Sequence, residues 1–188
     1  KLLLGLCEIL DCQDKFSILV NQLDKLDKVE SKKIKDNLKI KGFSSNQIDS
    51  IFDLIAKSYN INSNMDYFKN FFEKSIIGSQ GLYELEFIFN YFSKQKLLIS
   101  SLVFDMSLAR GIDYYTGVIF EVVQKNKSYG SIAGGGRYDN LTEIFGVNDT
   151  SGIGISFGLD RIFLTLDELK LFPEFKSKMV KVLFTNFG

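Results

Sequence analysis

Residues 102–123 read LVFDMSLARGIDYYTGVIFEVV, and this stretch decides the fold. Apolar and polar side chains alternate over 102–109, the period of two that is typical of a half-buried strand, and 118–123 predicts a second strand. Their hairpin-like spacing, with no crossover helix between them, favours an antiparallel sheet over a parallel one. The β-rich part of the chain is therefore expected to begin near residue 102.

The strand pattern continues towards the C-terminus. Residues 125–128 predict a turn, and 131–133 lead into the triple glycine at 134–136. A short helix is expected at 138–145 and a further strand at 153–157. Gly158 begins another helix, whose buried stripe is expected to be Leu159, Ile162, Phe163 and Leu166.

The part before residue 102 has a different pattern. Apolar side chains recur at spacings of three and four, which predicts four to six short helices up to about residue 100. Ser44 and Gln47 predict a capping box at the start of one helix, and Gly42 suits the end of the preceding one. Helices followed by an antiparallel sheet indicate the α+β class.

Composition excludes several classes of function. The 188 residues carry zero formal net charge and contain no histidine, so nucleophile schemes that use histidine as the general base cannot be built within the chain. Cys7 and Cys12 are the only cysteines, which argues against a zinc site or a disulfide framework. Charges interrupt the apolar stretches before they could span a bilayer, so no membrane association and a cytoplasmic location are expected.

Positive charge is distributed unevenly by residue type. Lysine is common, and the stretch 32–41 is basic, which is typical of a solvated helix face and leaves contact with an RNA backbone as the alternative. Arginine occurs only as Arg110, Arg137 and Arg161, each in or beside a glycine-rich run. Since a guanidinium grips phosphate, carboxylate or an aromatic ring in a fixed geometry, these runs predict the walls of one polar pocket.

A purely structural interpretation of each arginine remains open. In that interpretation Arg137 forms an ion pair at a helix start, and the other two pair with nearby carboxylates. The partners would be Asp105 or Asp113 for Arg110, and Asp160 or Asp167 for Arg161.

Four segments carry a family resemblance. Residues 108–117, LARGIDYYTG, resemble the histidine-recognition segment of histidyl-tRNA synthetases, and 133–139, AGGGRYD, resemble the second histidine-pocket segment of that family. Residues 158–161, GLDR, resemble the third motif of class II aminoacyl-tRNA synthetases. Residues 23–28, LDKLDK, are similar to a segment of the eukaryotic cytosolic and archaeal branch.

This resemblance implies histidine–tRNA ligase activity: L-histidine is activated by ATP to histidyl-adenylate and then transferred to tRNA(His). Arg110 would be the catalytic cation that neutralises the α-phosphate and the histidine carboxylate. ATP would bind to Arg161 and Gly158 together with Arg110, and Mg²⁺ would accompany the nucleotide without a tightly bound protein metal. The histidine-binding residues implied are Tyr114, Tyr115, Tyr138, Gly134, Gly135 and Gly136.

The resemblance also implies a domain organisation. Residues 1–100 would be mainly helical and include the family's insertion domain, 101–172 would be the C-terminal part of the catalytic domain, and 173–188 would be a linker and the start of the anticodon-binding domain. The first two class II motifs, including the one that forms the homodimer interface, are expected upstream, so the isolated chain is expected to be inactive. The alternative is a synthetase-like, non-catalytic domain with a tRNA-sensing or regulatory role.

Overall fold

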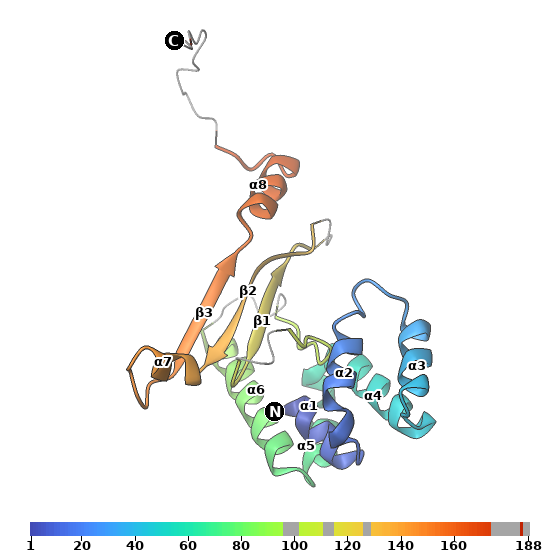
Figure 1. Cartoon of the computed structure of the whole chain (residues 1–188). Coiled ribbons are helices and arrows are strands. Elements are labelled where there is room, and N and C mark those ends of the chain that lie inside the picture. Colours follow the sequence, from blue (N-terminus) through green and yellow to red (C-terminus); the bar gives the residue numbers. More distant parts are fainter. Residues whose placement is uncertain (96–101, 111–114, 126–128, 174–184, 186–188) are drawn as a thin grey trace. The chain divides into compact units, whose positions relative to one another are not determined.

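The structure, a computed structural model, describes residues 1–95, 102–110, 115–125, 129–173 and 185 (Figure 1). The helices are α1 (Leu2–Ile9), η1 (Gln13–Lys15, 3₁₀), α2 (Phe16–Leu23), α3 (Ser31–Ile40), α4 (Ser45–Ser58), α5 (Ile61–Phe72), α6 (Ile76–Lys94), α7 (Asn140–Ile144) and α8 (Leu159–Glu168). The strands are β1 (Ile119–Val123), β2 (Ser131–Tyr138) and β3 (Gly152–Phe157). Helices followed by a three-stranded antiparallel sheet in the order β1-β2-β3 confirm the predicted α+β class.

The chain divides into two compact units. The first consists of Lys1–Phe120 and Gly135–Ile155, and the second of Glu121–Gly134 and Ser156–Gly188. Each unit is described by itself.

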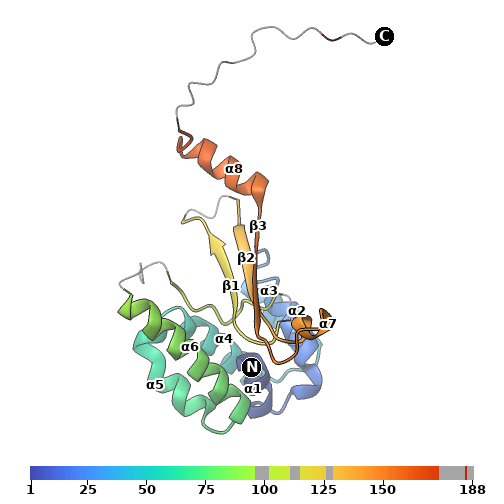
Figure 2. The same ribbon diagram turned by 90° about the vertical axis from the view of Figure 1, so that its left-hand side faces the viewer.

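The first unit contains the helices α1–α6, and α1 packs against both α5 and α6 (Figure 2). Glycine permits a very close approach of α1 and α6, because a Cβ on Gly5 would lie 2.5 Å from the Cα of Gly78. The remaining helices pack mainly against their neighbours in sequence, α2 on α3, α3 on α4 and α4 on α5.

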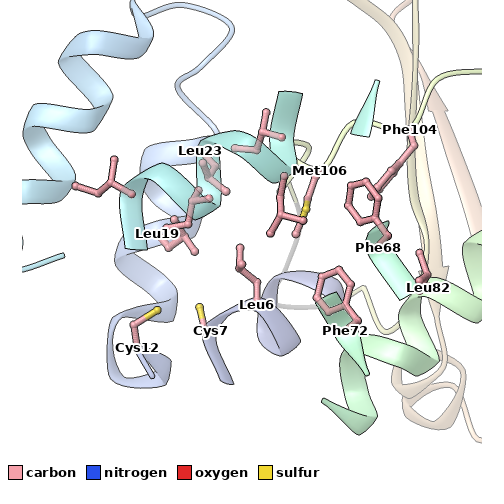
Figure 3. Close-up of a cluster of buried hydrophobic side chains, with 14 of the residues drawn as sticks. Leu6, Cys7, Cys12, Leu19, Leu23, Phe68, Phe72, Leu82, Phe104 and Met106 are labelled. Carbon is pink, nitrogen blue, oxygen red and sulfur yellow. The ribbon is translucent and has the colours of Figure 1, made fainter. Parts of the chain in front are cut away.

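The hydrophobic core of this unit lies between these helices (Figure 3). Leu6, Phe68 and Phe72 are fully buried in it, and the two free cysteines are buried there as well. Phe104 joins the same cluster, with its ring 5.9 Å from that of Phe68. The segment that begins at residue 102 is therefore packed against the helices through Phe104.

The predicted helix boundaries at α3 and α4 are confirmed. The Ser44 hydroxyl accepts the Gln47 N–H at 3.2 Å, and the Gln47 side chain accepts the Ser44 N–H at 2.8 Å, which completes the capping box. Gly42 ends α3 with a φ of 86°, and the N–H groups of Gly42 and Phe43 donate to Lys39 and Leu38. This is a Schellman motif, which requires the left-handed conformation that glycine adopts readily.

The strand predictions for 118–123 and 153–157 are confirmed by β1 and β3. The triple glycine lies inside β2, which continues to Tyr138, so the helix expected at 138–145 is shorter, Asn140–Ile144. The glycines are thus part of the sheet rather than a loop beside it.

The prediction of a strand over 102–109 is wrong, because residues 102–110 form turns and irregular structure. Asp105 accepts bonds from the N–H and the hydroxyl of Ser107, and the Met106 N–H donates to the Ser58 hydroxyl of α4 at 3.2 Å. Local bonds to an aspartate compete with strand pairing. Alternation nevertheless predicted the burial of Phe104 and Met106 correctly.

The predicted buried stripe of α8 is also wrong in part. Leu159 is 77% exposed and Phe163 is 56% exposed, whereas Thr165 is buried. The Phe163 ring lies 5.0 Å from the ring of Phe172, between ring centres. Apolar periodicity identified the helix, but a stripe becomes buried only where another element covers it.

Some predictions lie outside the described residues. These are the turn at 126–128, Tyr114 and nearly all of the segment 173–188, which was expected to be a linker and the start of the anticodon-binding domain. The domain boundaries near 100 and 172 remain predictions. No helix in the described part of the chain is both long and apolar enough to cross a membrane.

Candidate active site

Arg110 lies at the end of the irregular segment 102–110 in the first unit, where its side chain is 39% exposed. Its Nε donates to Asp24 Oδ1 at 3.2 Å, and its Nη2 donates to Asp27 Oδ2 at 3.3 Å. Asp105 instead bonds to Ser107 and Tyr59, and Asp113 lies outside the described residues. The guanidinium is therefore held by carboxylates more than eighty positions away in sequence.

Tyr115 lies next to the glycines of β2. A Cβ on Gly136 would come within 2.7 Å of Tyr115 Cδ1 and 2.9 Å of Cε1, so the ring occupies the space that any larger residue would need. Gly136 is buried, and Tyr115 is half-buried. The absence of a side chain at 136 therefore positions the aromatic ring predicted to bind the substrate.

Tyr138 and Gly135 contact β3 in the same way. A Cβ on Gly135 would lie 1.9 Å from the carbonyl oxygen of Gly154. The Tyr138 ring fills the space beside Gly152 and Gly154, where added Cβ atoms would lie 2.4 Å and 2.9 Å from it. Gly135 thus permits close packing of β2 on β3, which is a structural reason for glycine beside any role in a substrate pocket.

Arg137 forms a brace at the end of β2. Its Nε donates to Asp139 Oδ1 at 3.0 Å, and its Nη2 donates to the Ser151 hydroxyl at 2.8 Å. The hydrogen bond from Arg137 is the main reason why the pKa of the Asp139 carboxyl is lowered, and the Thr116 hydroxyl adds a second bond at 3.0 Å. The expected ion pair at a helix start is confirmed, since Asp139 directly precedes α7.

Arg161 lies in the first turn of α8, in the second unit. Its Nη1 donates to the Ser131 carbonyl at 2.7 Å, a different contact from the pairs with Asp160 or Asp167 that were considered. The Gly158 N–H donates to the Ile132 carbonyl at 2.8 Å, which fixes the start of the helix against β2. Gly130 has a φ of 70°, and a Cβ added to it would lie 3.9 Å from Arg161 Nη1.

The predicted site residues are distributed over both units. Arg110, Tyr115, Tyr138, Gly135 and Gly136 belong to the first unit, and Gly134, Gly158 and Arg161 belong to the second. Sequence reasoning missed Asp24 and Asp27 as partners of Arg110. The available signal was the repeat of Leu-Asp-Lys at 23–28, which was interpreted only as a mark of lineage.

Among the residues that the structure describes, no group of three or more cysteine, aspartate or glutamate side chains is arranged to hold a metal ion. The proposed site residues supply the guanidinium groups of Arg110 and Arg161 and the phenol groups of Tyr115 and Tyr138. Such groups bind anions and polar rings and stabilise developing negative charge.

Comparison with known proteins gives a consistent result. Residues 2–162 match the family model described as histidyl-tRNA synthetase. The chain is 46% identical to the histidine–tRNA ligase of Christiangramia forsetii and 41% identical to that of Porphyromonas gingivalis, in each case over its whole length and 41% of the relative. It therefore spans about two fifths of the curated relatives that it matches.

A solved structure shows the same fold. The crystal structure of histidyl-tRNA synthetase from Nostoc sp. PCC 7120 superposes with a TM-score of 0.79 at 25% identity, over 92% of this chain and 41% of that one. The relatives named here are bacterial, so the expected assignment to the eukaryotic cytosolic and archaeal branch is not supported.

Proposed function

The chain belongs to the histidyl-tRNA synthetase family, and on that premise we propose that it is part of a histidine–tRNA ligase. The observation that carries the proposal is the family match over residues 2–162, which includes all three arginines and both glycine-rich pocket segments. The proposed substrates of the complete protein are L-histidine, ATP with Mg²⁺, and tRNA(His). A homodimer in the cytoplasm is the proposed form of the complete protein.

The proposed chemistry at Arg110 is electrostatic. The histidine carboxylate attacks the α-phosphate of ATP in line, its oxygen forms the new bond to phosphorus, and pyrophosphate leaves with the electrons of the broken bond. A guanidinium beside both reacting groups offsets their mutual repulsion and the negative charge that develops on the phosphoryl oxygens. Arg110 is suited to this role because its charge is permanent and its side chain is partly exposed.

The proposed histidine pocket is formed by Tyr115, Tyr138 and the glycines of β2, with Tyr114 as a further member. The Tyr115 hydroxyl would bond to the substrate imidazole, and the contact of its ring with Gly136 keeps that hydroxyl in place. Catalysis in such a pocket depends mainly on positioning, which agrees with an absence of histidine from the chain.

The proposed contact with ATP is made by Arg161 and Gly158. A guanidinium can stack on a purine ring and keep its edge donors available, whereas a lysine ammonium cannot. The bond from Arg161 to the Ser131 carbonyl sets the direction of the side chain from the first turn of α8. Mg²⁺ would enter with the nucleotide as part of the substrate.

The test is histidine-dependent exchange of pyrophosphate into ATP by the complete protein, with Arg110→Ala as the diagnostic variant. We expect exchange by the complete protein and a loss of at least about a hundredfold in Arg110→Ala, because a preorganised charge at the reacting phosphate is removed. No exchange by the complete wild-type protein would favour the non-catalytic, tRNA-sensing or regulatory alternative, whereas exchange that is unchanged in Arg110→Ala would contradict the role proposed for Arg110. We also expect no exchange by residues 1–188 alone.

A further inference from the structure

The Leu-Asp-Lys repeat at 23–28 forms a turn with a period of three. The N–H groups of Lys25, Leu26 and Lys28 donate to the carbonyls three positions earlier, as in a 3₁₀ turn. Residues three positions apart then lie on the same face. The repeat therefore places its leucines, its aspartates and its lysines on three different faces of the turn.

The three directions have different environments. Leu23 is 1% exposed and Leu26 is packed against the same hydrophobic core, so the leucines anchor the turn. Lys25 and Lys28 are exposed. Asp24 and Asp27 occupy the third face, and both carboxylates bond to the guanidinium of Arg110.

We propose that Asp24 and Asp27 are positioning residues for Arg110 in histidine activation. This inference rests on the proposed function, because it concerns the residue that would act at the α-phosphate. The two aspartates bond to the guanidinium. Their own position is fixed by Leu23 and Leu26, which are packed in the hydrophobic core. The turn thereby connects the helical part of the first unit to the reacting groups.

The two aspartates bond to different nitrogen atoms of the guanidinium. A guanidinium has five N–H donors. Asp24 accepts from Nε and Asp27 accepts from Nη2, so these two bonds use two of the five and involve neither N–H of Nη1. The aspartates therefore restrict the rotation of the side chain through two different nitrogen atoms.

The number of contacts supports positioning. A single carboxylate would leave a long arginine side chain free to rotate about the contact, whereas two carboxylates on different atoms fix the plane of the fork. A misplaced catalytic group lowers the rate of the chemical step more than it lowers substrate affinity. Loss of the aspartates should therefore reduce kcat.

The first experiment tests the contact without reference to activity. The complete protein is labelled with ¹⁵N-arginine, and the Nε–H resonance of Arg110 is assigned by its loss in Arg110→Lys. We expect exchange of this proton with water to be about tenfold faster in Asp24→Asn, because a charged acceptor is replaced by a neutral one. Asp36→Asn is the matched control, since Asp36 is exposed on α3 and forms none of the ion pairs found among the described residues. Unchanged exchange in Asp24→Asn overturns the proposal, whether or not the protein is a ligase.

The second experiment tests the consequence for catalysis by steady-state pyrophosphate exchange. In Asp24→Asn/Asp27→Asn we expect kcat to fall about tenfold or more, with the KM values for ATP and histidine within about twofold, and Asp36→Asn to behave as the wild type. Asp24→Glu keeps the charge and should restore most of the rate. In an Arg110→Lys background the double substitution should cost much less, because the aspartates act through Arg110.

The outcomes separate this proposal from the proposed function. A complete protein that carries out no histidine-dependent exchange contradicts the proposed function and the catalytic role of the aspartates, although the NMR result would still report on the contact. A wild-type protein that is active, with kcat unchanged or KM lowered in the double variant, overturns positioning alone. A lowered KM would instead identify the aspartates as competitors of the substrate anions.

Discussion

The Tyr115 ring lies against Gly136, so closely that a Cβ at 136 would be 2.7 Å from Tyr115 Cδ1. The same Cβ would lie 2.9 Å from the Val118 carbonyl oxygen, so a shift of the ring would not by itself make room for a side chain at 136. The proposed histidine pocket thus depends on the sheet, because a glycine in β2 determines where an aromatic side chain can lie.

Replacement of that glycine should impair histidine binding. In the complete protein, Gly136→Ala should displace the Tyr115 ring and raise the KM for histidine by about tenfold or more, while the KM for ATP changes little. Exchange kinetics at varied histidine check this. Gly146→Asn is the control, because nothing lies within 4 Å of a Cβ there and asparagine tolerates its φ of 78°. A wild-type KM for histidine in Gly136→Ala would show that the ring contact does not matter for binding.

The close crossing of α1 and α6 predicts a loss of stability. Gly5→Ala would place a Cβ 2.5 Å from the Gly78 Cα, and backbone on both sides leaves little room to adjust. Overpacking of this kind costs roughly 1–3 kcal/mol. We expect a lower Tm by calorimetry or circular dichroism, and no loss in Asn70→Ala, which lies exposed on α5. Gly5→Ala with an unchanged Tm would mean that the two helices can separate without cost.

Two arginines should respond differently to the same substitution. Arg161→Lys removes the planar fork that donates to the Ser131 carbonyl, and we expect the KM for ATP to rise about tenfold. Arg137→Lys should leave the KM for ATP unchanged and lower the Tm, since Arg137 bonds to Asp139 and Ser151. Exchange kinetics at varied ATP measure both variants. An equal rise in KM for both would count against a specific role of Arg161 in ATP binding.

Acid stability should depend on Asp53. Lys57 forms an ion pair with this carboxylate and the Tyr67 hydroxyl donates to it at 2.8 Å, and these bonds lower the pKa of Asp53. Because the pKa is lower in the folded state, the carboxylate stabilises the fold at pH values above its pKa in the unfolded chain, which is about 4. This stabilisation is lost as the pH falls through the pKa of the folded state. We expect Asp53→Asn to flatten the fall of Tm with pH in that acidic range.

The size of this effect should be small. Asp53 is 44% exposed, so solvent screening limits its contribution to at most about 1 kcal/mol. Asp49→Asn is the control, because Asp49 is exposed on the same helix and belongs to none of the ion pairs found in the described part of the chain. A steeper fall of Tm with decreasing pH in Asp53→Asn would contradict a lowered pKa of Asp53.

The fold could be predicted where the signal is local. The capping box at Ser44 and the glycine stop at Gly42 are determined by residues within a few positions of each other, and both are confirmed. The alternation over 102–109 predicted the buried residues Phe104 and Met106 but not their conformation. Ser107 and Ala109, on the alternate positions, are buried as well, so the alternation did not separate a buried side from an exposed one, and a strand also needs a neighbour with which to pair.

The residues proposed for the site could be named from the sequence, but their contacts could not. The three arginines beside glycines were evident in the sequence, and the brace formed by Arg137 and Asp139 followed from their spacing of two. The partners of Arg110 could not be predicted, because Asp24 and Asp27 are separated from it by 86 and 83 positions. Nearby carboxylates were the natural guess, and one of them, Asp105, instead makes a local turn.

From the sequence alone, the α+β class, the end of α3, the start of α4 and the family could be predicted, since these depend on periodicity, caps and short motifs within a few residues. Only the tertiary structure decided that the Leu-Asp-Lys repeat faces Arg110 and that Gly136 makes room for Tyr115. Both contacts join segments far apart in the chain. Their geometry is determined by packing of the core and pairing of the strands, which no local pattern contains.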